Sequence, residues 1–261
     1  MSALRRVRLG APILGNFLLI PTFAAALIVK SGLEPQAAQA LIFLACAPFA
    51  PVVPLFVRMA NGHLALATGL TALFPVFSAL LTPCAVALSF WLMQDAGHET
   101  PSALVILKLL AASITLPLLL GIGFRERFPR FSSRIQKPME WLAEAIGVLS
   151  LAYLASLEAG HLTAFKLDQT GPFILFYEAS FVIGLLLGQG RFEDRLVMGF
   201  GTANRNIGLA ILLAAAITDD PDLLGEVLAQ SLLMLALALV HVAMARALSC
   251  ASIGSDPPPR G

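Results

Sequence analysis

The chain has 261 residues, of which 58% are hydrophobic and only 13% are charged. A soluble globular domain carries about 25% charged residues, so this composition excludes a disordered chain, collagen, a coiled coil and a secreted disulfide scaffold. It indicates a chain that is surrounded mostly by lipid. The formal net charge is +1, from 17 basic and 16 acidic residues, and this balance gives no basic field that would attract nucleic acid.

Eight apolar segments are candidates for membrane-spanning helices, which need about 20 mostly apolar residues each. They lie near residues 9–29, 36–57, 64–93, 102–124, 139–157, 172–187, 196–217 and 223–247. The polar stretches between them are short, so we expect residues 1–253 to form a single transmembrane domain and residues 254–261 to be a disordered tail. The expected fold class is an all-α polytopic membrane protein.

The distribution of basic residues predicts the orientation in the membrane. The apolar run after Arg5, Arg6 and Arg8 is too long for a signal peptide, so we interpret it as a retained first span. When both termini are placed in the cytoplasm, the inner loops hold 13 of the 17 Lys and Arg residues and the outer loops hold only Lys30 and Lys166. Cytoplasmic loops carry the excess of Lys and Arg. We therefore expect a multi-pass protein of the plasma (inner) membrane.

The ionisable residues Lys108, Glu178 and Arg205 fall well inside these spans. At a rise of about 1.5 Å per residue, Lys108 and Glu178 both lie about 9 Å from the outer end of their spans. They are expected to form an intramembrane ion pair, unless Lys108 extends outward to the interface. Arg205 lies near the midplane without an acid at its level. Two interpretations stay open, namely a guanidinium that backbone carbonyls satisfy at a helix break and an anion-binding residue in a central cavity.

Two spans contain residues that interrupt a helix. Pro48, Pro51 and Pro54 remove three backbone donors from the second span, which predicts a break or at least a kink. The seventh span contains Gly201 and the polar run Thr-Ala-Asn-Arg-Asn at 202–206, which a polar contact between helices could also explain. Irregular backbone at this depth persists where protein or water satisfies it. A pair of interrupted spans is the usual pointer to the binding site of a transporter, and half-helix N-termini attract anions.

Several short motifs occur in a characteristic order and spacing. They are Asn16–Pro21, Cys46–Pro48, the pair of segments 65–71 and 80–83, Gly184–Gly188 and Asn206–Ala210. In these motifs the chain resembles the bile acid:sodium symporter family, as a divergent and short, bacterial-type member. The resemblance implies an inverted-repeat transporter fold, in which a core domain with two crossing broken helices moves against a panel domain. Full members have ten helices and this chain matches from the third onward, which would leave the panel incomplete. Three explanations stay open, namely a short gene model, a truncated paralogue, and completion of the panel by a homo-oligomer or a partner chain.

The resemblance also places the family's sodium ligands, and most of them are absent. The corresponding positions hold Val53, Pro54, Ala67, Gly201 and Arg205, while Thr71 is kept and Asn16 replaces a glutamine. Sodium needs oxygen ligands, as other hard cations do, and an arginine repels it. Sodium coupling is therefore expected to be lost or altered. The alternatives are a sodium-coupled bile-acid-type symporter with a rebuilt ion site, and a non-transporting degenerate family member.

These observations predict a secondary transporter of a small organic anion that works by alternating access. Arg205 is the expected ligand for a carboxylate or sulfonate. Neutral hydrogen bonds are expected from Asn206, Asn204, Thr202, Thr71 and Asn16. The sequence has no nucleophile or zinc motif, and its four histidines are scattered, so we expect neither an enzyme nor a cofactor or metal site.

Overall fold

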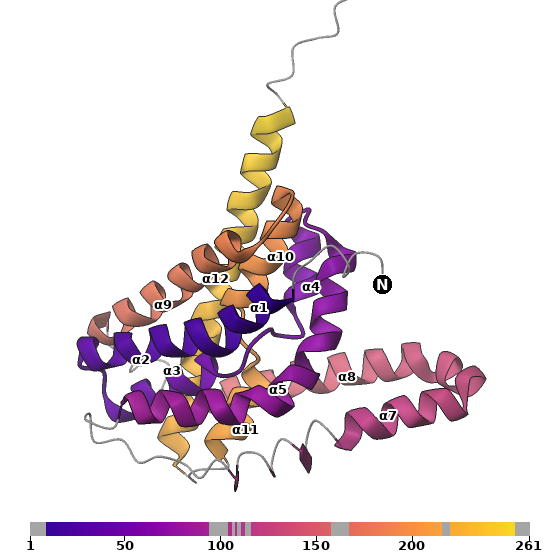
Figure 1. Cartoon of the computed structure of the whole chain (residues 1–261), viewed down its shortest axis with the longest axis horizontal. Helices are drawn as coiled ribbons and strands as arrows, with labels where there is room; N and C mark the ends of the chain where they lie inside the picture. Colours follow the sequence, from indigo (N-terminus) through magenta and orange to yellow (C-terminus); the bar gives the residue numbers. More distant parts are fainter. Residues whose placement is uncertain are drawn as a thin grey trace, which may run out of the picture.

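The computed structural model describes residues 9–93, 104–105, 108, 111–112, 116–157, 167–215 and 220–253. Within these residues the regular structure is helical and contains no strand (Figure 1), which confirms the all-α class. The elements are α1 (Gly10–Leu14), η2 (Gly15–Leu19), α2 (Ile20–Ser31), α3 (Pro35–Ala45), α4 (Val53–Met59), α5 (Leu64–Leu92), α7 (Leu116–Arg127), α8 (Pro129–Leu157), α9 (Leu167–Leu187), α10 (Phe192–Ala203), α11 (Ile207–Ala215) and α12 (Pro221–Ile253).

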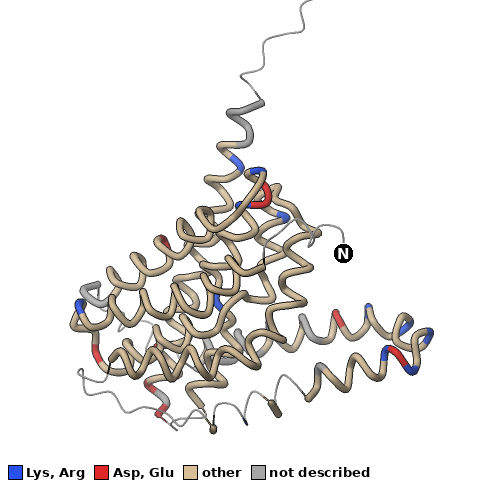
Figure 2. The backbone as a smooth tube through the Cα atoms, in the orientation of Figure 1, with Lys and Arg blue, Asp and Glu red and all other residues tan. Residues whose placement is uncertain are grey.

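Five helical stretches of the described chain are long and apolar enough to cross a membrane. They are Gly10–Ser31, Leu64–Leu92, Thr170–Leu187, Phe192–Ala215 and Asp222–Leu248. The expected span at 102–124 is described only in part, at 104–105, 108, 111–112 and 116–124, and the span at 139–157 is part of the longer helix α8. The total of eight spans stays a prediction. Charged residues gather at helix ends and at the far end of the α7–α8 hairpin (Figure 2), as expected of a multi-pass membrane protein.

The first span runs from α1 through a π-helical turn, η2, into α2 without a gap. In this turn the N–H of Ile20 donates to the carbonyl of Gly15, five residues earlier. The next residue is Pro21, which has no N–H. The carbonyl of Asn16 is therefore left without its usual helical donor and is free to accept a bond from elsewhere. Such π-turns occur often at functional sites.

Two spans are interrupted. The helix that contains α3 stops at Ala45 and resumes as α4 at Val53, and α10 stops at Ala203 before α11 begins at Ile207. Pro48 and Pro51 lie in the first gap. The structure corrects the other two expected break residues: Pro54 lies in the first turn of α4, where proline is tolerated because no helical donor is lost there, and Gly201 lies inside α10.

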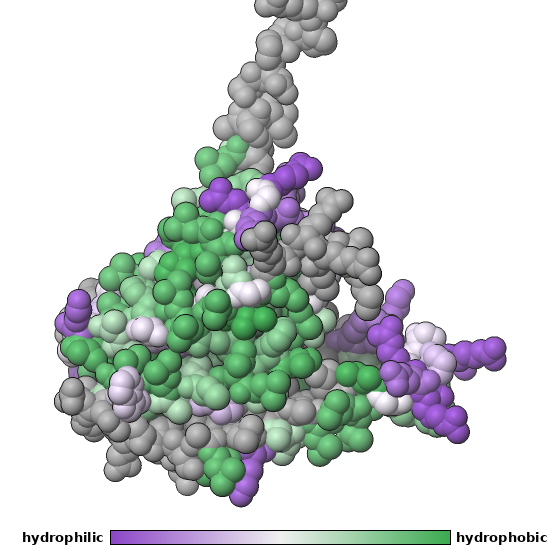
Figure 3. All heavy atoms as spheres, in the orientation of Figure 1, coloured by the Kyte–Doolittle hydropathy of each residue, from purple (hydrophilic) through white to green (hydrophobic). Residues whose placement is uncertain are grey.

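Two apolar cores lie on either side of these interruptions. One core joins α2, α3 and α11 with the end of α5 and the beginnings of α9 and α12, and the other joins α4 and α10 with the beginning of α5 and the second half of α12. Their largest buried side chains include Phe43, Phe90 and Phe176 in the first core and Phe74 and Phe200 in the second. The outer face of this body is also predominantly apolar (Figure 3), as a lipid-facing surface requires.

Helix α10 packs against α9 through glycines. A β-carbon on Gly184 would overlap the main chain at Met198 and Gly199, and one on Gly188 would overlap the main chain at Arg195. Gly184 and Gly188 are spaced as in the small-xxx-small pattern that lets membrane helices approach closely. This contact fixes α9 against the half-helix that leads into the second interruption.

Helices α7 and α8 form a hairpin that projects away from the remaining helices (Figure 1). Most of its described side chains are exposed, including Leu119, Leu120 and Trp141. Five basic residues between 125 and 137 lie around the turn of this hairpin.

Candidate functional site

The two interrupted helices bond to each other at their gaps. The N–H of Ala50 donates to the carbonyl of Asn204 at 2.9 Å, and the N–H of Asn206 donates to the carbonyl of Ala47 at 2.7 Å. Each gap therefore satisfies backbone groups of the other. Buried backbone groups rarely stay unpaired, and this reciprocal pairing explains how irregular backbone survives within the span.

The carbonyls at the end of α3 accept bonds from outside their own helix. Residues Leu44 and Ala45 accept from Arg205, Cys46 accepts from the hydroxyl of Thr82 at 3.1 Å, and Ala47 accepts from the N–H of Asn206. The last carbonyls of a helix have no partner within it. Residues 44–47 are fully buried, so the protein supplies the donors.

Arg205 is completely buried and every donor of its guanidinium is engaged. Nε donates to the carbonyl of Leu44 at 3.1 Å, and Nη2 donates to the carbonyls of Ala45 and, at 3.4 Å, of Asn16. Nη1 donates to Oδ1 of Asn16 at 2.7 Å and to the carbonyl of Thr202 at 2.9 Å. A guanidinium has five N–H donors, so none remains for a further ligand in this conformation.

The positive charge of Arg205 is stabilised by the C-terminal ends of two helices. Leu44 and Ala45 belong to the C-terminal turn of α3, and Thr202 belongs to the C-terminal turn of α10. A helix C-terminus carries a partial negative charge, and two such ends converge on the buried cation. Of the two interpretations that the sequence left open, the geometry favours the guanidinium satisfied by backbone carbonyls.

The other expected substrate residues differ in their surroundings. Asn16 and Thr202 join Arg205 in one buried cluster, in which Nδ2 of Asn16 donates to Thr202 Oγ1 at 3.3 Å. Asn204 lies in the gap with Oδ1 buried and, within the described residues, without a partner. Asn206 is half-buried and caps α11, because its Oδ1 accepts the N–H of Leu209. Thr71 does not join the cluster, and its hydroxyl is buried without a described partner.

Gly201 has a packing role that explains why a side chain is excluded there. A β-carbon on Gly201 would overlap the ring of Phe49. Phe49 has a φ of 59° and stacks on Phe74 with 4.4 Å between ring centroids. A bulky residue with positive φ is strained and persists only where its surroundings hold it. Gly201 makes room for this ring, which closes the first gap from one side.

The expected ion pair between Lys108 and Glu178 is not formed among the described residues. Glu178 instead meets His241, with 3.0 Å between Oε2 and Nε2. The side chain of Lys108 is exposed. This pairing was not predicted, although both residues lie in apolar spans and therefore need a partner.

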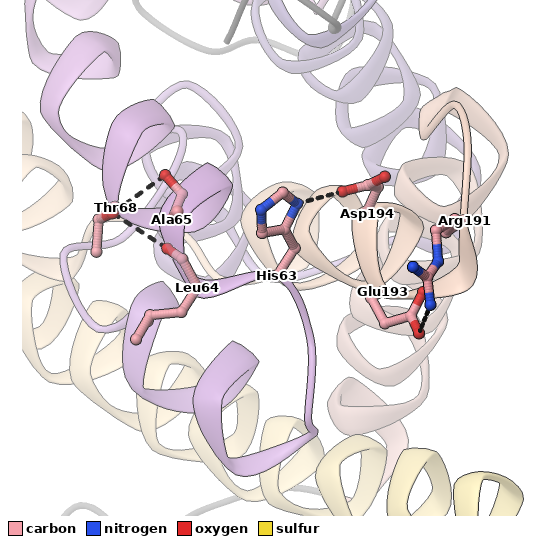
Figure 4. A network of polar contacts seen from close by, with 7 residues as sticks. All are labelled: His63, Leu64, Ala65, Thr68, Arg191, Glu193 and Asp194. Carbon is pink, nitrogen blue, oxygen red and sulfur yellow. Dashed lines mark hydrogen bonds and ion pairs between the residues drawn. The ribbon is translucent and has the colours of Figure 1, made fainter. Parts of the chain in front are cut away.

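A second histidine joins the ends of two other spans. Nδ1 of His63, before α5, lies 2.6 Å from Oδ1 of Asp194 at the start of α10 (Figure 4). The main-chain N–H of His63 donates to the carbonyl of Glu193. Nearby, Arg246 donates to the carbonyl of Met59. The end of α4, the start of α10 and the second half of α12 thus meet at one end of the described structure, whereas the basic turn of the α7–α8 hairpin lies apart from them (Figure 2).

The described residues contain no group of three or more His, Cys, Asp or Glu side chains that could hold a metal ion. The carbonyl oxygens at the crossing are the hard ligands that a sodium ion would use. Those that face Arg205 already accept bonds from its guanidinium. The residues present therefore do not fit a sodium ion at this place.

These features define a multi-pass helical membrane protein with two interrupted helices that meet at their gaps. Residues 3–165 match the model of the "Sodium Bile acid symporter family", and the chain belongs to this family. The match includes the first interrupted helix and ends before the second.

The chain is also similar to a chloroplastic protein of Oryza sativa subsp. japonica, described as "Probable sodium/metabolite cotransporter BASS2". The two are 24% identical over 185 residues, which cover 69% of this chain and 42% of the relative. The chain thus matches less than half of the length of that protein.

Proposed function

We propose that this chain is a secondary transporter that moves a small organic anion across the inner membrane by alternating access, without sodium coupling. The observation that carries the proposal is the crossing of α3–α4 with α10–α11, which buries a positive charge between two helix gaps. Interrupted helices of this kind form the central binding sites of secondary transporters. The cotransporter name of the rice relative supports the same class.

In this proposal Arg205 acts on the substrate through its charge and not through direct contact, because its five donors are engaged. The direct hydrogen bonds would come from Asn206, which is half-buried beside it, and from the first N–H groups of α11. A helix N-terminus has unpaired N–H groups and a partial positive charge. An anion at this position would gain from both.

The same geometry supports the loss of sodium coupling. The guanidinium supplies the positive charge that a bound cation would otherwise bring to these carbonyls. A sodium ion would have to displace it and would be repelled by it. Arg205 is therefore a resident cation, fixed to the chain.

Two finer features of the family fold belong to this proposal. The interrupted helices run in opposite directions, since the end of α4 leads to His63, which bonds to the start of α10. This is the relation that inverted repeats require. Both termini would lie in the cytoplasm, and a homo-oligomer or a partner chain would complete the panel domain.

The test is uptake of labelled taurocholate and of a panel of carboxylates into liposomes that contain the purified protein. An inward gradient of NaCl is compared with one of N-methylglucamine chloride at equal ionic strength. We expect saturable uptake of at least one anion, equal in the two salts and absent from protein-free liposomes. Uptake that requires sodium would favour a rebuilt ion site, and the absence of saturable uptake of every anion would favour a degenerate, non-transporting member.

A further inference from the structure

A buried histidine and a carboxylate from two apolar spans meet away from the helix crossing. Glu178 lies near the centre of the span Thr170–Leu187, about 12 Å from either end at a rise of about 1.5 Å per residue. Its partner His241 lies in the span Asp222–Leu248. The imidazole is 4% exposed, whereas 43% of the Glu178 side chain is exposed.

The surroundings fix the orientation of the imidazole. The ring of His241 stacks on that of Phe181, with 3.8 Å between centroids and 11° between planes. Nε2 faces Glu178 Oε2 at 3.0 Å. Nδ1 is buried and has no hydrogen-bond partner among the described residues. One nitrogen is therefore committed to the carboxylate, and the other is an unpaired polar atom within an apolar span.

We infer that Glu178 and His241 form a proton-binding pair, and that in the proposed transport cycle a proton takes the coupling role that sodium has lost. The first part depends only on the pair, and the second rests on the proposed function. Without an added proton, the pair is an imidazole that donates Nε2–H to a carboxylate, with a net charge of −1. One proton, taken up at the exposed carboxylate, makes it neutral, either as carboxylic acid with imidazole or as carboxylate with imidazolium at Nδ1.

This change of charge matters because of the depth. An uncompensated charge is costly in the middle of an apolar span. The protonated, neutral pair can be shielded from water and moved past lipid more easily than the charged one. A conformational change that carries the pair between an open and a closed environment would therefore be linked to uptake and release of the proton.

The charged side chains on the helices next to the Glu178–His241 pair have partners outside this pair. On α10, Glu193 pairs with Arg191, Asp194 pairs with His63, and Arg195 donates to the carbonyl of Leu185. On α12, Arg246 bonds to Met59, and Glu226 accepts from Gln230.

Among the side chains that the structure describes, the remaining titratable ones on α9, on α12 and on the helices that pack against them are Lys30, Arg58, Asp222 and Tyr177. The first three lie at or near helix ends, and Tyr177 is buried with a hydroxyl that has no described partner. Within the described residues, the only polar partner of the Glu178 carboxylate is therefore His241.

Helix α12 connects the pair to the crossing. The sulfur of Met234 accepts the main-chain N–H of Arg205 at 3.0 Å. Met234 and His241 are seven positions apart, which is about two helical turns and places them on the same side of the helix. A shift of α12 that follows protonation would thus act directly on the residue that holds the two gaps together.

The proton-binding part is tested by NMR titration of the protein in lipid nanodiscs, with glutamate labelled by ¹³C at the side-chain carboxyl. The resonance of Glu178 is identified by its absence in Glu178→Asp, which keeps a carboxylate, and in Glu178→Gln. We expect it to titrate in wild type and to titrate at a different pH in His241→Gln. His63→Gln, which removes the histidine of an exposed pair, is the matched control and should leave the curve unchanged. An identical curve in His241→Gln, or no titration in the folded protein, would overturn the inference.

The coupling part is tested by sodium-free uptake of taurocholate, whose sulfonate stays ionised, into liposomes with an acidic outer solution. With one proton per anion, a gradient of one pH unit supports about tenfold accumulation. We expect this accumulation in wild type and none in Glu178→Gln, while exchange of internal for external taurocholate continues in the variant.

Uptake that does not depend on the pH gradient would overturn the proposed proton coupling and leave the proposed transport function intact. If taurocholate is not carried, the same pH arms are run with whichever carboxylate the uptake panel identifies. If the panel identifies none, the proposed function and the coupling fall together, whereas the titration of the pair still stands or fails by itself.

Discussion

Arg205 bonds both oxygens of Asn16, a residue 189 positions earlier in the chain. The side-chain oxygen is a normal acceptor, but the main-chain oxygen is available only because the π-turn and Pro21 remove its helical donors. Arg205 thereby links the first span to the gap between α10 and α11. The π-turn η2 and the gap between α10 and α11 are thus joined through Arg205.

The first prediction concerns the stability that Arg205 provides. Arg205→Met removes all five donors and leaves the carbonyls of Leu44, Ala45 and Thr202 buried without these bonds. A buried group that loses its partner costs about 1–3 kcal/mol, and breaking a buried charge network costs about 3–5 kcal/mol. We expect a loss of about 3–5 kcal/mol in the free energy of unfolding, measured in detergent with denaturant.

Arg191→Ala is the matched control for this substitution. Arg191 is an exposed arginine that pairs with Glu193 at 3.1 Å. Exposed pairs of this kind contribute about 0–1 kcal/mol. An Arg205→Met variant that unfolds at the same denaturant concentration as Arg191→Ala would contradict the network described at the crossing.

The second prediction concerns the room that Gly201 makes for Phe49. Gly201→Ala places a methyl group where the ring of Phe49 lies, and overpacking of a filled interior costs about 1–3 kcal/mol. Gly208→Ala is the control, because its β-carbon would meet only Asn206 Oδ1 at 3.6 Å, an ordinary contact. In the double variant with Phe49→Ala the clash is absent, so the two losses should not add. Thermal unfolding of wild type, Gly201→Ala, Phe49→Ala and the double variant measures this coupling.

The third prediction concerns the contact between α9 and α10. Gly184→Ala would push a methyl group into the main chain of Met198, which cannot move aside as a flexible side chain can. We expect a loss of about 1–3 kcal/mol in stability. Gly171→Ala in the same helix has nothing within 4 Å and should be neutral, or up to about 1 kcal/mol stabilising, since alanine favours a helix. Equal unfolding temperatures for the two variants would show that the close approach is not needed.

Patterns of residue type predicted much of this architecture, but not the roles of single residues. The apolar runs predicted helices, and Pro48, Pro51 and the polar run 202–206 located the two gaps because each disturbs the regular backbone. Gly201 was expected to break the helix, yet its missing side chain serves packing. A glycine within a helix is ambiguous in sequence, since both uses require only the absence of a β-carbon.

The partners of the buried charges could not be predicted. Arg205 is satisfied mainly by carbonyls, which every residue carries, so no side chain signals them. Glu178 was assigned to Lys108 from depth alone, and His241 was overlooked because this histidine was not counted among the ionisable residues inside the spans. A search for a second ionisable residue within an apolar span would have found it.

The fourth prediction concerns orientation, which the excess of inner Lys and Arg supports. In a variant without native cysteines, Lys30→Cys at the end of α2 should react with a membrane-impermeant maleimide added to intact cells. Arg191→Cys at the start of α10 should react only after the cells are opened. Both side chains are exposed in the structure, so accessibility of the residue itself does not separate them. The reverse labelling pattern would invert the proposed topology.

The last prediction concerns the resident cation. Wild-type protein should unfold at the same temperature in NaCl and in N-methylglucamine chloride, because no site is left for sodium to stabilise. Arg205→Gly removes the guanidinium and leaves the oxygens of Asn16, Leu44 and Ala45 facing a space of its size. In this variant, millimolar guanidinium should raise the unfolding temperature, and sodium should do so if the freed carbonyls suffice as ligands. Because Arg191→Ala removes only an exposed arginine, it should gain no such dependence. A saturable sodium effect on wild type would mean that a cation site coexists with Arg205, and the guanidinium would then not be its substitute.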